Sequence, residues 1–191
     1  MFQTPFRPPT VFIRTEYSCH YSLQQVYCKH MPGRLQSEIR QSRPFPHPAE
    51  EAFLNLQRTA DWLLRGVEET LRSFSLTHPQ YNVLRILGGA GADGLPCGEL
   101  SARMITRDPD ITRLLDRLEK RGYVRRGRGV EDRRVVRAYL TEEGGTALRS
   151  LDKPMRDAVR GPLAPLGAVK LEQLTGLLEE IRIQMESTAS I

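Results

Sequence analysis

The sequence of residues 107–140, RDPDITRLLDRLEKRGYVRRGRGVEDRRVVRAYL, contains two different patterns, one after the other. In the first half, apolar residues recur at the spacing of a helix with one buried face: Ile111, Leu114, Leu115 and Leu118. Asp108 is placed to cap this helix, and Pro109 fits its first turn, where a proline loses no hydrogen bond. Gly122 is placed to end it. The first half therefore predicts an amphipathic helix.

In the second half of this stretch the period changes from that of a helix to two. Alternating side chains predict antiparallel strands at Tyr123–Arg126 and Val135–Leu140. The polar segment Gly127–Arg134 between them predicts the tip of a hairpin. The stretch that decides the fold is therefore predicted to be a helix followed directly by a two-stranded hairpin.

Positive charge is concentrated in the same region. Between Arg103 and Arg137 twelve residues are basic and six are acidic, a local net charge of +6 against +5 for the whole chain. A solvated charged face would explain the helix taken alone. A basic helix followed by a basic hairpin instead favours a nucleic-acid partner, because the helix fits the major groove and the arginines neutralise phosphates on either side.

The motifs DITRLLDRLEKRGYVRR, EDRR and VRAYLTEEG resemble the winged helix-turn-helix of the MarR family, bacterial regulators that sense small molecules or oxidants. The resemblance covers about residues 49–184 and is strongest over the stretch just quoted. It implies a mainly α fold with a small β-hairpin wing. The implied organisation is a MarR-like domain at residues 49–187, with the winged helix-turn-helix at about 76–140 and dimerisation helices at about 49–74 and 142–187.

Residues 1–48 differ from the rest of the chain, since they are rich in proline and have no sustained periodicity. They predict an N-terminal extension that is largely irregular or disordered. The apolar run Val11–Ile13 is too short for a signal peptide, and no run approaches the ~18 residues of a membrane span. Three cysteines form no disulfide framework, which favours a reducing compartment. We therefore expect a cytoplasmic protein without a membrane partner.

Helical patterns flank the deciding stretch on both sides. Phe53–Leu71 carries one apolar stripe, and Thr77 with Gln80 forms the sequence pattern of a capping box. Thr141 is placed to cap a further helix, which Pro154 is expected to kink or interrupt. A last amphipathic helix follows, with apolar residues between Leu171 and Met185. The first and last helices are too apolar to lie alone on a small core, so we expect them to bury each other in a homodimer. Members of the family use their terminal helices in this way.

The resemblance also implies which residues contact double-stranded DNA. The helix at 109–121 would enter the major groove, and an acid at the wing tip would orient an arginine in the minor groove. A plain turn residue is the alternative for Asp132. The candidate DNA-binding residues are Thr106, Arg107, Asp110, Thr112, Arg113, Arg117, Arg126, Arg128, Asp132, Arg133 and Arg134.

The function implied is that of a transcriptional regulator, a repressor that binds a pseudo-palindromic operator and is released by a small aromatic or carboxylate effector. One alternative is a thiol-based redox regulator. The first helix, where oxidant-sensing members carry a reactive cysteine, contains none, which leaves Cys97 at the start of the helix-turn-helix. Another alternative is a winged helix used for protein contacts, although such a wing has no need of so many arginines.

The sequence gives no sign of an enzyme or of a bound cofactor. The motifs HExxH, GxSxG and the P-loop are absent. Gly89–Gly94 spells GxGxxG, but a helical pattern precedes it where a dinucleotide fingerprint needs a strand. We expect Gly88–Gly94 to be a loop that connects two helices. The Cys and His residues between Cys19 and His30 match no zinc-binding spacing. We therefore expect no catalytic, cofactor or metal site.

Overall fold

A computed structural model describes residues 34–106, 110–129 and 134–189 of the 191-residue chain. The chain divides into two compact units, Met1–Pro46 and His47–Ile191. In the first unit the described residues form one short helix, α1 (Arg34–Glu38). This helix lies within the N-terminal segment for which the sequence predicted largely irregular structure, and it was not predicted.

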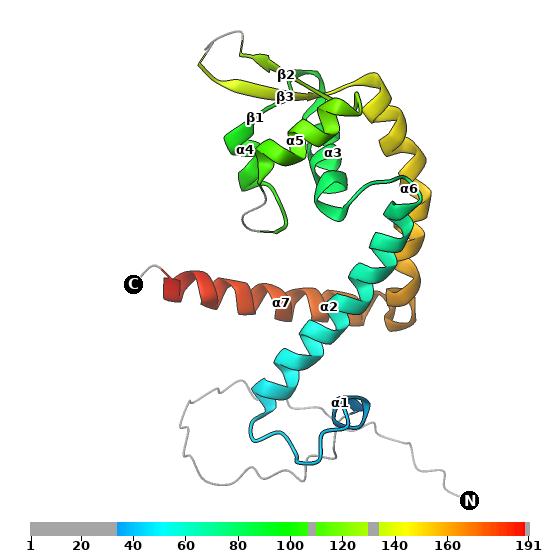
Figure 1. Cartoon of the computed structure of the whole chain (residues 1–191). Coiled ribbons are helices and arrows are strands. Elements are labelled where there is room, and N and C mark those ends of the chain that lie inside the picture. The colour runs from blue at the N-terminus through cyan, green and yellow to red at the C-terminus, as the bar shows by residue number, and fades with distance from the viewer. Residues whose placement is uncertain (1–33, 107–109, 130–133, 190–191) are drawn as a thin grey trace, which may run out of the picture. The chain divides into compact units, whose positions relative to one another are not determined.

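The second unit is mainly helical and carries a small antiparallel sheet (Figure 1). Its α-helices are α2 (Pro48–Arg72), α3 (His78–Ala90), α4 (Cys97–Ala102), α5 (Ile111–Lys120), α6 (Glu142–Leu163) and α7 (Gly167–Ala189). Two 3-10 turns, η1 (Gly91–Asp93) and η2 (Ala164–Leu166), follow α3 and α6. The strands are β1 (Leu95–Pro96), β2 (Val124–Arg128) and β3 (Val136–Leu140), in the order β1-β3-β2. The predicted fold class, mainly α with a hairpin wing, is confirmed.

The core lies where α3, α4, α5 and the sheet meet, and α6 and the end of α2 cover it (Figure 1). The predicted apolar face of α5 is buried as a whole, since its isoleucine and its three leucines are all buried. The largest fully buried side chains are Leu71, Leu84, Leu87, Leu100, Leu115, Leu118, Leu151, Val83 and Val124. This core fixes α5 against the sheet and leaves its other side outward.

Two of the predicted helix caps are confirmed. At the start of α3, the Thr77 hydroxyl accepts a hydrogen bond from the Gln80 amide at 3.4 Å, and the Gln80 side chain accepts one from the Thr77 amide at 3.0 Å. At the start of α6, the Thr141 hydroxyl accepts from the Gly144 amide at 3.0 Å. Each cap satisfies backbone donors that the first turn of a helix leaves without partners.

The predicted start of α5 is wrong by two residues. The cap is Asp110 rather than Asp108: its carboxylate accepts a hydrogen bond from the Arg113 amide at 3.0 Å, and the helix begins at Ile111. Asp110 precedes Arg113 by three residues, which is the spacing that an N-cap side chain needs. Asp108 and Pro109, the predicted cap and first-turn proline, lie outside the described residues.

The hairpin is antiparallel as predicted, but its strands have different limits. β2 runs on to Arg128, because Gly127 pairs with Arg137 and Arg128 pairs with Val136. The third strand, β1, was not predicted. Its two residues pair with the far edge of β3, Leu95 with Ala138, and a strand of two residues shows no period that could identify it.

Two helices run further than predicted. α3 includes Gly88, Gly89 and Ala90, which the sequence placed in a loop. A Cβ at Gly88 would lie 2.7 Å from the Leu148 side chain, so the glycine permits α3 and α6 to approach closely. α6 likewise passes through Pro154 without interruption. The buried residues Leu151 and Met155 on either side of this proline hold the helix on the core.

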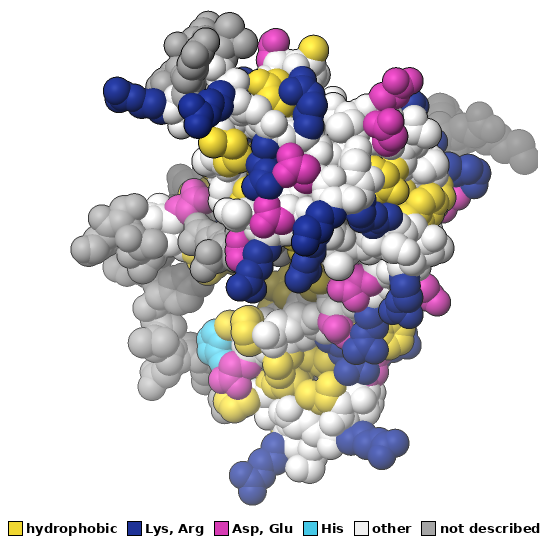
Figure 2. Space-filling model, turned by 45° about the horizontal axis from the view of Figure 1, so that its top comes forward, with side chains coloured by type: hydrophobic (Ala, Val, Ile, Leu, Met, Phe, Trp, Pro, Cys, Tyr) yellow, Lys and Arg dark blue, Asp and Glu magenta, His cyan; other side chains and the backbone are white. Residues whose placement is uncertain are grey.

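Helices α2 and α7 expose much apolar surface in this single chain. The exposed large hydrophobic residues on them are Phe53, Leu56, Trp62, Leu64, Val169, Leu174, Leu177, Ile181, Ile183 and Met185. Trp62, for example, is 68% exposed. Among the described residues no helix is long and apolar enough to cross a membrane. Figure 2 shows a group of apolar side chains in the lower part of the view, and Lys and Arg side chains over much of the visible face.

Candidate nucleic-acid interface

Helix α5 presents one polar face to the outside. Thr112, Arg113 and Arg117 are exposed, opposite the buried apolar face of the same helix. Arg117 has no hydrogen-bond or ion-pair partner among the described residues. A helix held by its apolar face and presenting a hydroxyl and two guanidinium groups has the shape and the charge that a major groove accepts.

Asp110 lies at the end of this face and is already engaged. Besides capping α5, its carboxylate pairs with the Arg113 guanidinium, 3.1 Å from Nε. The Arg113 side chain stays 79% exposed, so the ion pair orients it without burying it. The predicted contact residue Asp110 therefore acts within the chain as a cap and as an orienting partner for Arg113.

Arg126, another candidate, points from β2 toward α5 rather than into solvent. Its guanidinium lies 2.6 Å from the Asp116 carboxylate and 2.5 Å from Glu119 Oε2. The Arg126 amide also donates to Glu119 Oε1 at 3.0 Å. Its charge is thus met by two acids of α5, and the contact ties the wing to the helix. As a DNA contact, Arg126 stays a prediction.

The hydrogen bonds from Arg126 hold the pKa of the Glu119 carboxyl below its usual value. A carboxyl whose pKa is lower in the folded state stabilises the fold above its unfolded pKa of about 4.3, and this stabilisation is lost as the pH falls through the folded value.

We therefore expect Glu119→Gln to lower the free energy of unfolding by about 0.5–1 kcal/mol at pH 7, a small value because water screens a side chain this exposed. At an acid pH below the folded pKa of Glu119, the variant and the wild type should unfold alike. Urea unfolding at the two pH values measures the difference, and an equal loss at both would show that Glu119 does not act through its charge.

Two further arginines have structural roles that sequence reasoning missed. Arg121, which follows α5, donates to the carbonyl oxygens of Phe74 at 3.0 Å and Ser75 at 2.5 Å. Arg137 on β3 donates to the carbonyl oxygens of Asp93 and Gly94, both at 3.1 Å. Their acceptors lie more than forty residues earlier in the chain, and no local sequence signal connects them.

The remaining candidates lie around the wing and the turn before α5. Thr106 in that turn is exposed, as are Arg128 at the end of β2 and Arg134 just before β3. Arg107, Asp132 and Arg133 lie outside the described residues. The structure therefore brings Thr112, Arg113 and Arg117 together on one helix face and places Arg128 and Arg134 at the base of the wing tip.

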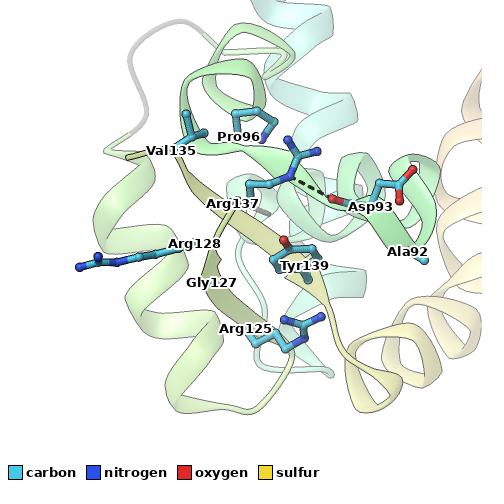
Figure 3. A pocket seen from close by; sticks show the side chains of 10 residues that line it. Ala92, Asp93, Pro96, Arg125, Gly127, Arg128, Val135, Arg137 and Tyr139 are labelled. Carbon is cyan, nitrogen blue, oxygen red and sulfur yellow. Dashed lines mark hydrogen bonds between the residues drawn. The ribbon is translucent and has the colours of Figure 1, made fainter. Parts of the chain in front are cut away.

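A groove of about 820 Å³ lies on the face of the β2–β3 sheet that is turned away from α5 (Figure 3). We call it the wing groove. Arg125, Arg137 and Tyr139 line it, with Asp93 and Pro96 on its β1 side. The other lining residues are Ala92, Gly127, Arg128, Gly129 and Val135. No residue of this groove other than Arg128 was predicted as a site residue.

The chemistry of a catalytic or metal site is not evident in the part of the chain that the structure describes. No group of three or more His, Cys, Asp or Glu residues there is placed to hold a metal ion. Cys97 is half-buried at the start of α4, and burial raises the pKa of its thiol. The other two cysteines lie in residues 1–33, outside the described ranges.

Comparison with known proteins connects this geometry to one family. The model of the MarR family matches residues 76–136. The homoprotocatechuate degradative operon repressor of Escherichia coli is 32% identical over 110 residues, which cover 58% of this chain and 73% of the repressor.

Two solved structures resemble the chain over nearly their whole length. The crystal structure of a MarR transcription factor from Planctomyces limnophilus is 39% identical with a TM-score of 0.56, and the match covers 71% of this chain and 98% of that one. CouR from Rhodococcus jostii RHA1, crystallised with p-coumaroyl-CoA, is 26% identical with a TM-score of 0.63, covering 72% and 95%.

Proposed function

This chain belongs to the MarR family, and on that premise we propose that it is a DNA-binding transcriptional repressor that acts as a homodimer in the bacterial cytoplasm. The observation that carries the proposal is the outward face of α5. Thr112, Arg113 and Arg117 stand on a helix whose opposite face is entirely buried, beside a wing whose exposed arginines include Arg128 and Arg134. The same observation disfavours a winged helix that serves only protein contacts.

The experiment that tests this function is selection of bound genomic fragments by the purified protein. A two-fold dimer must meet a two-fold site, so we expect the selected fragments to share a pseudo-palindrome with half-site centres about one helical turn, roughly 34–36 Å, apart. Fragments without a shared dyad, or binding that ignores the spacing of the half-sites, would contradict the proposal.

The exposed apolar residues of α2 and α7 support the homodimer. α7 is almost wholly exposed, and an isolated helix with so much apolar surface gains little stability in water. We expect a dimer whose interface exceeds the ~1,000 Å² of a biological contact. Light scattering at micromolar concentration measures the mass.

The control for this measurement is Ile181→Arg, which places a charge on the exposed apolar surface of α7 and removes no buried side chain. We expect this variant to shift toward the monomer while its helical circular dichroism is retained. A wild-type protein that is itself a stable monomer would end the dimer proposal.

The effector that we propose is a small aromatic or carboxylate compound. Two similar proteins support this class, the repressor of a homoprotocatechuate degradative operon and CouR, which was crystallised with p-coumaroyl-CoA. Aromatic acids and their acyl thioesters are titrated into the protein–operator complex. We expect compounds of one chemical class to release the DNA. Retention of DNA throughout, together with no ligand-induced rise in melting temperature, would count against an effector of this class.

The redox alternative depends on Cys97. A thiol is reactive as its thiolate, and burial at the start of α4 disfavours that form by raising the pKa. We therefore expect mild peroxide to leave operator affinity nearly unchanged. Mobility-shift titrations with and without peroxide measure this. Release of the DNA by peroxide that Cys97→Ser abolishes would establish the redox alternative instead.

A further inference from the structure

The wing groove owes its shape to a glycine in the middle of a strand. Along β2 the side chains alternate, so Val124 and Arg126 face the core and α5, and Arg125 and Gly127 face outward. On β3 their cross-strand partners are Tyr139 and Arg137. Gly127 has no side chain to cover the sheet between these groups, which leaves a hollow flanked by two guanidinium groups.

Both guanidinium groups are held in place before any ligand arrives. Arg137 donates to the carbonyl oxygens of Asp93 and Gly94. The Arg125 guanidinium lies over the Tyr139 ring, 4.0 Å from its centre. A free arginine side chain loses much conformational entropy when a ligand immobilises it, and a side chain that is already fixed loses less.

Neither arginine is neutralised by a residue that the structure describes, in contrast to Arg126 on the other face of the sheet. Within the described residues no carboxylate pairs with Arg125 or Arg137. Asp93 lines the groove, but Figure 3 shows its carboxylate pointing away from Arg137, which contacts only its backbone oxygen. The groove therefore holds two fixed positive charges that face solvent.

The groove is continuous with the wing. Its rim includes Arg128 and Gly129 at the end of β2 and Val135 just before β3. A duplex that receives α5 in its major groove and the wing in the next minor groove must continue past the wing on the side away from α5. The sugar-phosphate backbone there is an anionic ridge, and an open, positively charged groove is complementary to it.

We propose that the wing groove binds backbone phosphates of the DNA that flanks the operator, outside the half-site read by α5. Arg125 and Arg137 are the binding residues, and they add affinity without reading sequence, since phosphate contacts carry no base information. The proposal rests on the proposed function, because it requires that α5 and the wing engage a duplex.

Gly127 offers a test that disturbs no hydrogen bond. A Cβ at this position would meet the Tyr139 ring at 3.5 Å and Arg125 Nη1 at 3.8 Å, both ordinary contacts. Gly127→Glu therefore places a carboxylate beside the two arginines. Gly127→Gln fills the same space without the charge and is the matched control. Circular dichroism and melting temperature verify that both variants fold.

Affinity is measured on two duplexes, the operator ending at the wing contact and the same operator extended on each side by one helical turn, about 10 base pairs. For the wild type, extension should raise affinity, and Gly127→Gln, which fills part of the hollow without adding charge, should keep more of this gain than Gly127→Glu. Extension should also steepen the slope of log affinity against log salt by about 0.9 for each added phosphate contact. Gly127→Glu should bind the short duplex like Gly127→Gln and lose most of the gain on the long one, on the order of tenfold if two contacts per wing are lost.

The outcomes separate this inference from the proposed function. Wild-type binding that is indifferent to extension overturns the wing groove as a DNA contact and leaves the function intact. Equal behaviour of Gly127→Glu and Gly127→Gln on the long duplex overturns it as well. Failure of the wild type to bind either duplex in preference to unrelated DNA would overturn the function itself.

Discussion

Replacing Gly144 with alanine is expected to lower the free energy of unfolding by about 3 kcal/mol or more, a value at the upper end for an overpacked core site. A Cβ at this position would lie 2.1 Å from the Tyr123 carbonyl oxygen and 2.8 Å from the Leu140 side chain. The oxygen belongs to the backbone and accepts a hydrogen bond from the Thr141 amide at 3.1 Å, so it cannot move aside without breaking the start of α6. Urea unfolding followed by circular dichroism measures the loss.

The matched control is Gly145→Ala, one residue further along the same helix. A Cβ there would meet only the end of the flexible Arg149 side chain, at 3.3 Å, and Leu140 at 3.9 Å. Alanine is favoured over glycine within a helix by about 1 kcal/mol, so this variant should be as stable as the wild type or more so. In Gly144→Ala the same preference for alanine opposes the steric clash, so the expected loss of stability is what remains after this preference is subtracted. Equal stability of the two variants would mean that α6 does not dock against Tyr123 as described.

Arg113→Ala is expected to cost roughly 1–3 kcal/mol of operator binding, which is about 5- to 150-fold in affinity. Arg113 is the third residue of α5, and the first residues of a recognition helix are the ones that reach base edges. Its loss should relax the preference at one operator position. It also leaves the Asp110 carboxylate near the DNA without its partner. Mobility-shift titrations on operators with single substitutions measure both effects.

Two further substitutions serve as comparisons for Arg113→Ala. Arg117, nearer the end of α5, is expected to behave as a phosphate contact: Arg117→Ala should weaken all operators alike and lower the salt slope by about 1. Arg160→Ala, on the exposed surface of α6, is the control for loss of charge alone and should leave affinity within about twofold, since a single distant charge is screened. If Arg113→Ala lowers affinity uniformly for every operator, Arg113 is a phosphate contact and does not read a base.

The sequence by itself predicted those parts of the fold that neighbouring residues determine. The apolar spacing from Ile111 to Leu118 sufficed for α5, because a helix with one apolar face has one way to bury it. The caps at Thr77 and Thr141 were predicted because their partners lie three residues away. The hairpin after Gly122 was predicted because the alternation of side chains along each strand is also a local pattern. The DNA-binding residues stay predictions, since their test is binding itself.

Tertiary structure alone decided what each arginine does. Arg113, Arg121, Arg126 and Arg137 are the same residue type within one basic stretch, and local pattern does not distinguish them. Arg121 and Arg137 each donate to carbonyl oxygens that folding brings within reach from 47 and 43 residues away, and Arg137 does so while it lines the wing groove. Arg126 turns inward because β2 passes beside two acids of α5. The pairing of β1 with β3 depends likewise on residues 43 positions apart. A guanidinium group binds whichever acceptors the fold places near it. The positive charge available to DNA on this surface therefore depends on which arginines the fold pairs with acidic side chains.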